Sequence, residues 1–353
     1  MIKIIFRTLM SLIILLLIIV VYLSIIGVKT KKFNSKIISQ IKQIEPNIEL
    51  KLNEVSARFD PFKFVINIKT IGTDLTYRNK IIKIQSIKSN ISIKSYLNNK
   101  FALTGISIST KSLLIKDLIT LVRLINNDPK LFIAEQFIKN GYLVADLELE
   151  FDELGNIKDN YKFNGFVKDG KISFSKRYNL NKIDFIFEKK EKKLKFNEIK
   201  LFLNNKNILI TELIVLKQNK EYLISGKLNN NNTILSKNEI KHLISDDLSE
   251  LDIKEISFNS KNNFKFKLNK NWKFKNLNVK SDIDIDTLKL KNPLKLKNIF
   301  QKIKKEFIFK NQKIKLEYKK DNLSINGGGE VFLQNKADIV EYEIHKKKNE
   351  VKF

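Results

Sequence analysis

The amino-acid sequence predicts a mainly β protein: an N-terminal transmembrane helix, followed by an elongated, curled antiparallel β-sheet with a few short helices. Two observations lead to this fold class. Residues 8–28 (TLMSLIILLLIIVVYLSIIGV) carry no charged side chain, and the rest of the chain consists largely of short runs in which apolar and polar residues alternate. A helix over residues 8–28, at about 1.5 Å per residue, is about 30 Å long, which is enough to cross the hydrocarbon core of a bilayer.

The apolar run of residues 8–28 fits either a cleaved signal peptide or a retained anchor. The apolar core of a signal peptide is usually about 7–15 residues long and is followed by small residues at the cleavage site. The run here is longer, and no alanine occurs before Ala57, so a retained anchor is predicted. Lys3 and Arg7 precede the run and three lysines follow it between residues 29 and 32, so the positive-inside rule does not decide the orientation.

The strand prediction rests on alternation, which is strictest in residues 143–151. Leu147, Leu149 and Phe151 fall on one face of a strand there, whereas Glu148 and Glu150 fall on the other. This pattern predicts a sheet with one apolar and one solvated face. It recurs along the chain between turns rich in Asn, Gly and Asp, and the number of such runs predicts about 17–20 strands.

Helical spacing interrupts the strands in four segments. Pro46 ends the first segment, and Pro129 divides the second into two helices. No linker rich in proline, glycine or serine follows the anchor, so residues 29–353 are predicted to form one continuous domain. Its apolar face must close into a barrel, pack as a sandwich, or hold another apolar molecule in a groove. The four helical segments are residues 36–44, 112–137, 235–245 and 293–305.

The charge of the chain is a weak indication of a nucleic-acid partner. The formal net charge is +28 and the pI is near 9.8, which are values compatible with nucleic-acid binding. Only five of the 66 basic residues are arginine, however, and arginine is the side chain that best fits phosphates and base edges. We therefore expect no nucleic-acid partner.

Side chains suited to catalysis or metal binding are scarce. The chain has no cysteine, and its two histidines, His242 and His345, lie far apart in the sequence. Residues 327–329 (GGG) lack the lysine of a phosphate-binding loop and predict a bulge or a strand end. Asp282, Asp284 and Asp286 alternate with apolar residues and predict the outer face of a strand rather than a calcium site. We expect no enzyme activity, no metal site and no cofactor.

Two stretches of sequence carry a resemblance to a known family. Residues 55–110 run from VSARFDPFKFVINIKTIGTDLTY into IIKIQSIKSNISIKSYLNNKFALTGISIST, in which a strand leads through a helix-like YLNN step back into a strand. Residues 165–174, GFVKDGKISF, place a Gly-x-x-x-Asp-Gly turn between two strands. With the apolar N-terminus, these stretches resemble the AsmA-like family, the bacterial, YhdP- and TamB-related branch of the bridge-like lipid-transfer superfamily.

The resemblance implies a place in the cell envelope and a role. Residues 1–7 would be cytoplasmic, residues 8–28 would be a single-pass anchor in the bacterial inner membrane, and residues 29–353 would form an AsmA-like β-groove in the periplasm. The groove would shield acyl chains and assist phospholipid transport between the inner and outer membranes, with outer-membrane or periplasmic proteins as further partners. Family members are often longer, so the chain is expected to be either a short paralogue or an N-terminal piece truncated at its C-terminus.

The residues expected to line the groove are apolar members of the alternating runs, because a floor of Ile, Leu and Phe replaces the bilayer around lipid tails at about 0.8 kcal/mol per methylene. The alternative is a closed core made of the same residues, in a structural or assembly factor that transports no lipid and offers strand edges to outer-membrane proteins. The predicted lipid-binding residues are Ile66, Ile93, Leu147, Leu149, Phe185, Phe187, Ile210, Ile224, Phe266 and Ile285.

Overall fold

The computed structural model describes most of the chain. The predicted helical segments 36–44 and 293–305 lie outside the described residues except at a few positions, and so does His242. The described residues are 2–32, 34–35, 38–39, 42, 46–77, 80–125, 129–173, 179–204, 206–219, 221–241, 252–269, 273–291, 305–347 and 350–352.

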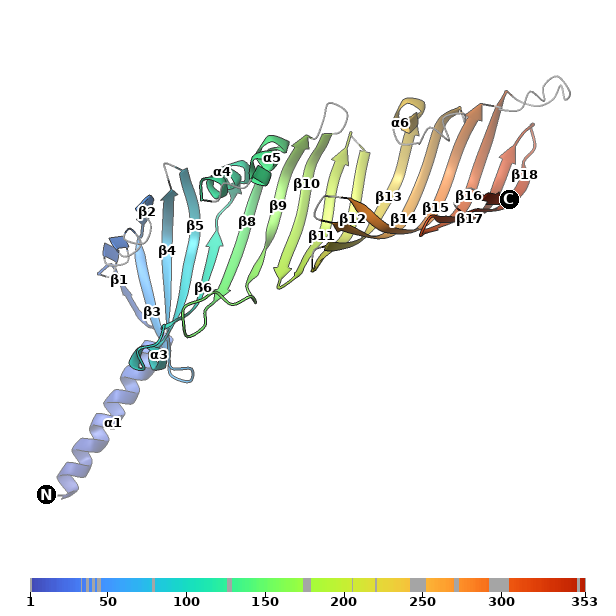
Figure 1. Cartoon of the computed structure of the whole chain (residues 1–353). Helices are drawn as coiled ribbons and strands as arrows, with labels where there is room; N and C mark the ends of the chain where they lie inside the picture. The colour runs from blue at the N-terminus through green and yellow to red at the C-terminus, as the bar shows by residue number, and fades with distance from the viewer. Residues whose placement is uncertain are drawn as a thin grey trace. The chain divides into compact units, whose positions relative to one another are not determined.

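Strands make up 68% of the structure and form one antiparallel sheet of 19 strands in the part of the chain described, so the mainly β prediction is confirmed (Figure 1). The strands are β1 (Val28–Thr30), β2 (Ile48–Lys51), β3 (Glu54–Asp60), β4 (Val65–Tyr77), β5 (Lys80–Ser92), β6 (Leu103–Thr110), β7 (Leu113–Leu114), β8 (Ile138–Glu150), β9 (Lys162–Ser173), β10 (Asn179–Lys190), β11 (Lys193–Leu203), β12 (Lys206–Gln218), β13 (Glu221–Ser236), β14 (Ile253–Asn269), β15 (Phe274–Lys291), β16 (Glu306–Lys319), β17 (Asn322–Phe332), β18 (Asp338–Lys347) and β19 (Glu350–Lys352).

The helices lie largely where the sequence predicts them. Pro129 is the first residue of its helix, a position that tolerates proline because its missing N–H would have no partner there. At the YLNN step a helix of five residues forms, and the Ser92 hydroxyl caps it by accepting the N–H of Ser95 at 3.1 Å. The described helices are α1 (Ile2–Ile25), α3 (Ile93–Leu97), α4 (Ile115–Ile125), α5 (Pro129–Phe137) and α6 (Lys237–Lys241).

Strand order follows the sequence with small exceptions. β3, β4, β5 and β6 pair in succession, and from β8 onward each strand pairs with the next. β1 adds to β3, β2 adds to β4, and β7 adds to β8. Several turns place Asn or Asp in the left-handed conformation, for example Asn204, Asn219 and Asp321. The turn predicted at Asp169–Gly170 is not one of them, because both residues lie inside β9, where the pairing with β8 contains a bulge.

Contacts between Cα atoms divide the chain into two compact units. The first unit is Met1–Ser173 with Phe187–Glu191, and the second unit is Phe174–Ile186 with Lys192–Phe353. The first unit therefore holds α1 and the sheet up to β9, and the second holds the sheet from β11 to the end of the chain.

The stretch Lys3–Ile25 of α1 is long and apolar enough to cross a membrane, with 23 residues, a mean hydropathy of 3.0 and no burial against the rest of the chain. Both a membrane anchor and a signal sequence fit this finding. α1 begins at Ile2, before the predicted start at residue 8, because the charged side chains of Lys3 and Arg7 are compatible with a helix. It ends before residue 28 because Gly27, at φ 73°, adopts the left-handed conformation typical of a residue that follows a helix.

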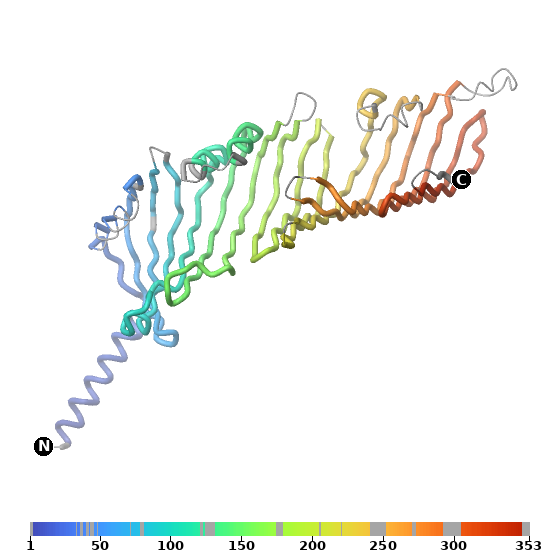
Figure 2. The backbone as a smooth tube through the Cα atoms, viewed as in Figure 1, coloured from blue at the N-terminus to red at the C-terminus, as the bar shows by residue number. Residues whose placement is uncertain are grey.

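The chain passes from α1 directly into the sheet of the first unit. Val28, the first residue of β1, lies opposite Ala57 of β3, and α1 itself contacts β3. A Cβ atom at Gly27 would come within 2.5 Å of the Ala57 carbonyl oxygen, so the junction packs tightly against β3. In Figure 2 the tube of α1 meets the first unit at the end of the sheet where α3 also lies, as labelled in Figure 1.

Both units carry β-bulges at matching positions in neighbouring strands. In the first unit the pairing of β5 with β6 shifts at Gln85, and Gly72 of β4, at φ 65°, lies opposite. In the second unit the pairing of β12 with β13 shifts at Thr211, and Glu198 of β11, at φ 52°, lies opposite. A bulge adds one residue, bends the strand and changes which side chains face each side of the sheet beyond it.

Candidate functional site

Apolar side chains of the first unit gather on one face of its sheet. Residues directly opposite each other in an antiparallel pair point to the same side. One series of partners runs from Ile108 through Leu147 to Phe163. The first apolar face, defined by such series, comprises Val55, Ala57, Phe59, Ile66, Ile68, Ile87, Ile91, Ile106, Ile108, Leu143, Ala145, Leu147, Leu149, Phe163 and Val167.

The second unit has a corresponding face. One series of partners runs from Val215 through Ile224 to Phe266. The second apolar face comprises Leu194, Phe196, Ile199, Leu201, Ile208, Ile210, Leu213, Val215, Ile224, Leu228, Phe264, Phe266, Leu268, Val279, Ile283, Ile285, Leu288, Ile314, Leu316, Leu323, Ile325, Val331, Val340 and Ile344.

The bulges keep each face apolar where simple alternation would not. Phe196 and Ile199 are three residues apart and would point to opposite sides of a regular strand. Their partner series across β12 end at Gly226 and Leu228, which are two residues apart in β13 and therefore share a side. The sequence marks the bulge by two consecutive polar residues, Asn197 and Glu198, between two apolar runs.

Most side chains on the two apolar faces are only half-buried. Among the ten residues predicted to line a groove, Phe187 and Ile285 are buried, with 6% and 7% of their surface exposed, and the other eight are intermediate. In the part of the chain described, the strands make their main contacts with their sheet neighbours, and no second sheet packs on either face. The closed sandwich considered from the sequence is therefore not what the described residues form.

Nine of the ten predicted residues lie on these faces. Seven of them are members of the two faces defined above. Phe187 belongs to the first apolar face, because its ring centroid is 5.0 Å from that of Phe163. Phe185 belongs to the second apolar face, because its ring centroid is 5.5 Å from that of Phe196. Ile93 does not lie in a strand, because α3 begins there and its N–H donates to the Phe64 carbonyl at 3.0 Å. That these residues bind lipid stays a prediction.

Aromatic rings lie over glycines on both faces. An added Cβ would come within 3.0 Å of the nearest ring atom at three such glycines, so each glycine leaves room for a ring that covers the backbone. Residues 327–329, predicted to mark a bulge or strand end, lie inside β17, and the bulge is in the neighbouring β16. The pairs are Gly165 with Phe187, Gly226 with Phe264 and Gly327 with Tyr342.

A row of buried polar side chains interrupts each apolar face near the bulges. The Thr70 hydroxyl accepts the N–H of Ile87 at 3.1 Å and the hydroxyl of Thr73 at 2.9 Å, which supplies partners where the ladder is disturbed. In the second unit Gln312 supplies a partner for a backbone carbonyl, because its Nε2 donates to the Glu330 carbonyl at 2.8 Å. Periodicity in the sequence does not reveal this row, whose members are Thr70, Thr73, Ser260, Ser281 and Gln312.

The opposite face of the sheet is charged, and its lysines and carboxylates pair across strands. Such exposed pairs contribute about 0–1 kcal/mol each. The hydrogen bond from Lys195 is the main cause that lowers the pKa of the Glu212 carboxyl. Asp282, Asp284 and Asp286 lie on this face and are exposed, as predicted. Examples of the pairs are Lys162–Glu148 at 3.2 Å, Lys195–Glu212 at 2.9 Å, Lys280–Glu317 at 2.9 Å and Lys289–Glu255 at 3.0 Å.

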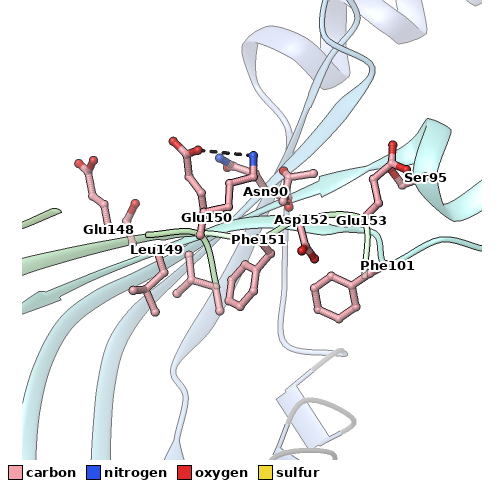
Figure 3. A pocket seen from close by; sticks show the side chains of 14 residues that line it. Asn90, Ser95, Phe101, Glu148, Leu149, Glu150, Phe151, Asp152 and Glu153 are labelled. Carbon is pink, nitrogen blue, oxygen red and sulfur yellow. Dashed lines mark hydrogen bonds and ion pairs between the residues drawn. The ribbon is translucent and has the colours of Figure 1, made fainter. Parts of the chain in front are cut away.

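A cavity of about 600 Å³ lies in the first unit where β5, β6 and β8 approach α3. Figure 3 shows that Glu148 and Glu150 point to one side of β8, whereas Leu149 and Phe151 point to the other side together with Phe101. The close-up therefore shows the division between charged and apolar sides at single-residue level. The carboxylates on the charged side are partnered by lysines, with Glu150 3.8 Å from Lys158.

Metal-binding groups do not gather in the part of the chain described. No group of three or more His, Cys, Asp or Glu residues there is placed to hold a metal ion. His345 is exposed on β18, and its Nε2 lies 2.9 Å from a carboxylate oxygen of Glu343. The apolar faces are thus the feature that needs a functional explanation.

Comparison of the chain with models of known protein families, with curated proteins and with solved structures finds no match in any of the three. An apolar N-terminal helix followed by a long antiparallel sheet is consistent with the β-groove family that the sequence resembles.

Proposed function

We propose that the protein is a membrane-anchored β-sheet protein that shields acyl chains and assists phospholipid transport between the inner and outer membranes of a bacterial envelope. α1 would be a retained single-pass anchor in the inner membrane, and the rest of the chain would lie in the periplasm. The ligands would be phospholipids, whose tails would lie on the apolar faces while their head groups stay in water.

The observation that carries this proposal is that no second sheet covers the two apolar faces among the described residues and that most of their side chains are only half-buried. Half-buried Ile, Leu and Phe side chains in such number are costly in water, since each apolar side chain gains about 1.5–3 kcal/mol when it becomes fully buried. An acyl chain is a suitable cover, because it contributes about 0.8 kcal/mol for each buried methylene and needs no hydrogen-bond partner.

The polar atoms of the sheet support the same proposal. The ladder pairs backbone groups of neighbouring strands, and near a bulge of the first unit the Thr70 hydroxyl accepts the Ile87 N–H. An acyl chain on the apolar face would therefore meet few unpaired backbone groups. Lysines and carboxylates occupy the other face, so they would not have to be desolvated.

The proposal is tested by extracting the full chain, with α1, from membranes in a mild detergent and analysing it by native mass spectrometry. We expect phospholipids to remain bound at more than one per chain, and we expect the protein to transfer labelled phospholipid between vesicles. A chain that is folded, carries no phospholipid and transfers none would contradict the proposal.

The alternative function is that of a structural or assembly factor that transports no lipid. For this function we expect a different result from the same experiment. The folded chain would then be free of phospholipid and would instead retain an outer-membrane protein. Strand edges would be the contact in that case, because an unpaired edge offers hydrogen bonds to a client strand.

A further inference from the structure

The turns at one end of the first unit carry exposed apolar side chains where turns normally carry polar ones. In the turn between β3 and β4, Phe62 is 99% exposed, and in the loop between β8 and β9, Leu154 is 86% exposed. In α3, Tyr96 and Leu97 are 70% and 69% exposed. Turns are normally built from Gly, Asn, Asp, Pro and Ser, so large apolar residues at several neighbouring tips need an explanation.

The turns of the second unit show the contrast. There the tips hold Asn204, Asn219 and the pair Lys320–Asp321, each in the left-handed conformation that suits a tight hairpin. Two exposed apolar side chains do lie next to turns of the second unit, Phe274 at 69% and Ile339 at 83%, but these turns are at opposite ends of the strands. In the part of the chain described, it is the first unit that gathers several such side chains at one edge.

The apolar tips belong to one connected edge of the first unit. The N–H of Ile93 in α3 donates to the carbonyl of Phe64 in the β3–β4 turn at 3.0 Å. The N–H of Phe101, which follows α3, donates to the carbonyl of Glu153 in the β8–β9 loop at 3.2 Å. We call residues 61–64, 93–101 and 151–157 together the anchor-end edge.

Each tip on this edge is held in a defined conformation. The Asp60 carboxylate accepts the N–H groups of Phe62 and Lys63, both at 3.1 Å. The Asp152 carboxylate accepts the N–H groups of Leu154 and Asn156, both at 2.9 Å. The turns are thus capped, and the exposed side chains project from a preorganised backbone.

The anchor-end edge lies on the side of the sheet from which α1 extends. Val28, the first strand residue after α1, lies opposite Ala57 of β3, and β3 continues past Ala57 to Asp60 before the turn that carries Phe62. Three further residues of strand, at about 3.3 Å each, place this turn roughly 10 Å beyond the junction, toward the side on which α1 lies. Exposed lysines, Lys63 and Lys94, flank the apolar tips.

We propose that the anchor-end edge is a membrane-contacting surface: Phe62, Leu97 and Leu154 enter the interface of the bilayer that holds α1, with Tyr96 at head-group depth and the flanking lysines at the lipid phosphates. The proposal rests on the retained anchor of the proposed function. Amphipathic aromatic rings favour the depth of the head groups, and lysines favour anionic lipid surfaces. α1 alone would leave the sheet free to tilt on the membrane, whereas three inserted tips would fix its orientation.

Side chains at this edge also lead to the first apolar face. The rings of Phe101 and Phe151 have centroids 5.7 Å apart, and Figure 3 shows both on the same side of β8 as Leu149. Apolar surface therefore continues from the anchor-end edge to a residue of the first apolar face. A bilayer at this edge would be in contact with both the anchor-end edge and the first apolar face.

The absence of cysteine from the chain allows a direct test. The full chain, with α1, is reconstituted into vesicles of phosphatidylethanolamine and phosphatidylglycerol as single-cysteine variants Phe62→Cys, Leu97→Cys or Leu154→Cys that carry an environment-sensitive fluorophore. We expect quenchers attached to lipid tails to reduce the fluorescence of all three and aqueous iodide to have little access. Asn204→Cys and Asn219→Cys are matched controls at polar turns, and we expect iodide to quench them.

Labels at the three tips that iodide quenches as strongly as the controls, and that lipid quenchers do not reach, would overturn the proposal. Failure of the full chain to remain on the vesicles would overturn it as well. These positions are exposed, so loss of fold is not expected, and a melting curve for each variant checks this.

A second measurement separates this proposal from the proposed function. The variant Phe62→Ser/Leu97→Ser/Leu154→Ser is expected to accept phospholipid from vesicles at least about 5-fold more slowly, with an unchanged melting curve, because the edge no longer enters the bilayer. Normal phospholipid transfer with water-exposed tips would refute the membrane-contacting edge and leave the proposed function standing. Inserted tips on a chain that never binds phospholipid would refute the proposed function and support the edge.

Discussion

The two faces of the sheet differ in how completely their side chains are satisfied by the chain itself. On the charged face, lysines form ion pairs with carboxylates of neighbouring strands, as Lys162 does with Glu148 at 3.2 Å. Solvent can hydrogen-bond the remaining polar atoms of these exposed side chains. On the apolar faces, the backbone is satisfied, but side chains such as Leu149 and Phe266 remain half-exposed. Only the apolar faces would therefore gain free energy by acquiring a cover.

The largest effect is expected from a charge placed on an apolar face. Leu149→Asp puts a carboxylate where acyl chains would lie, and ionised and protonated forms are both unfavourable in that setting. We expect phospholipid transfer to fall at least about 10-fold, which corresponds to about 1.4 kcal/mol. The Tm should fall by only a few degrees, roughly 2–4 °C per kcal/mol, because Leu149 is half-buried.

The matched control is Glu148→Gln, one residue away on the charged face, which should lose only its exposed ion pair with Lys162 and retain transfer. A folded Leu149→Asp protein with normal transfer would contradict lipid movement along the first apolar face. Complete unfolding of Leu149→Asp would instead mean that the face is sealed in solution.

An intermediate effect is expected where a polar group lies on an apolar face. Thr70→Val removes the hydroxyl that accepts the Ile87 N–H and contacts Thr73, a residue with 0% exposure. Leaving these buried groups without a partner should cost about 1–3 kcal/mol. The free energy of unfolding of the first unit, measured by denaturant titration, reports the loss.

Thr211→Val is the control, because Thr211 is exposed and its hydroxyl lies 3.5 Å from the Lys227 carbonyl. Its effect should stay within about 0.5 kcal/mol. Equal losses for the two variants would show that the apolar face does not protect its buried hydrogen bonds from water.

The smallest effect concerns the anchor-end edge at acid pH. Hydrogen bonds, first from the Asn156 side chain, lower the pKa of Asp152 in the folded chain. The ionised carboxylate therefore favours the folded loop above the ordinary Asp pKa of about 3.9, and this contribution is lost as the pH falls through the lowered value. We expect the hydrogen-exchange protection factors of the Leu154 and Asn156 amides to decrease across that range. In Asp152→Asn they should not change with pH, and the same decrease in this variant would refute the assignment.

Much of the fold could be predicted from the sequence because alternation reports facing directly. Residues 143–151 have strict period 2, and the structure has that strand with Leu147 and Leu149 on one face and Glu148 on the other. The side of the sheet to which a side chain points could not be predicted beyond the bulges. Glu198 and Thr211 change the phase of the alternation, and only the pairing of the strands reveals this change. Alternation predicts Ile93 on a strand face, but α3 begins at this residue. The Ser92 cap that starts α3 is a local hydrogen bond, which periodicity does not report.

The candidate site could be predicted only in part. Nine of the ten proposed residues lie on the two apolar faces, because each lies in an alternating run. The sequence could not decide between an open face and a closed core, since both use the same apolar residues. The exposed tips such as Phe62 and Leu154 were not predicted, because a single apolar residue in a turn carries no periodic signal and only its exposure in the fold makes it conspicuous.

The most direct test of the central claim is site-specific photo-crosslinking in living cells with neighbouring residues of opposite facing. A photoreactive amino acid replaces Leu149 or Glu148 in β8 of the first unit, and Phe266 or Lys267 in β14 of the second. We expect phospholipid adducts at Leu149 and Phe266 and none at Glu148 and Lys267, because only the first of each pair lies on an apolar face. Equal labelling of both members of a pair, or no phospholipid at any of the four positions, would contradict the account.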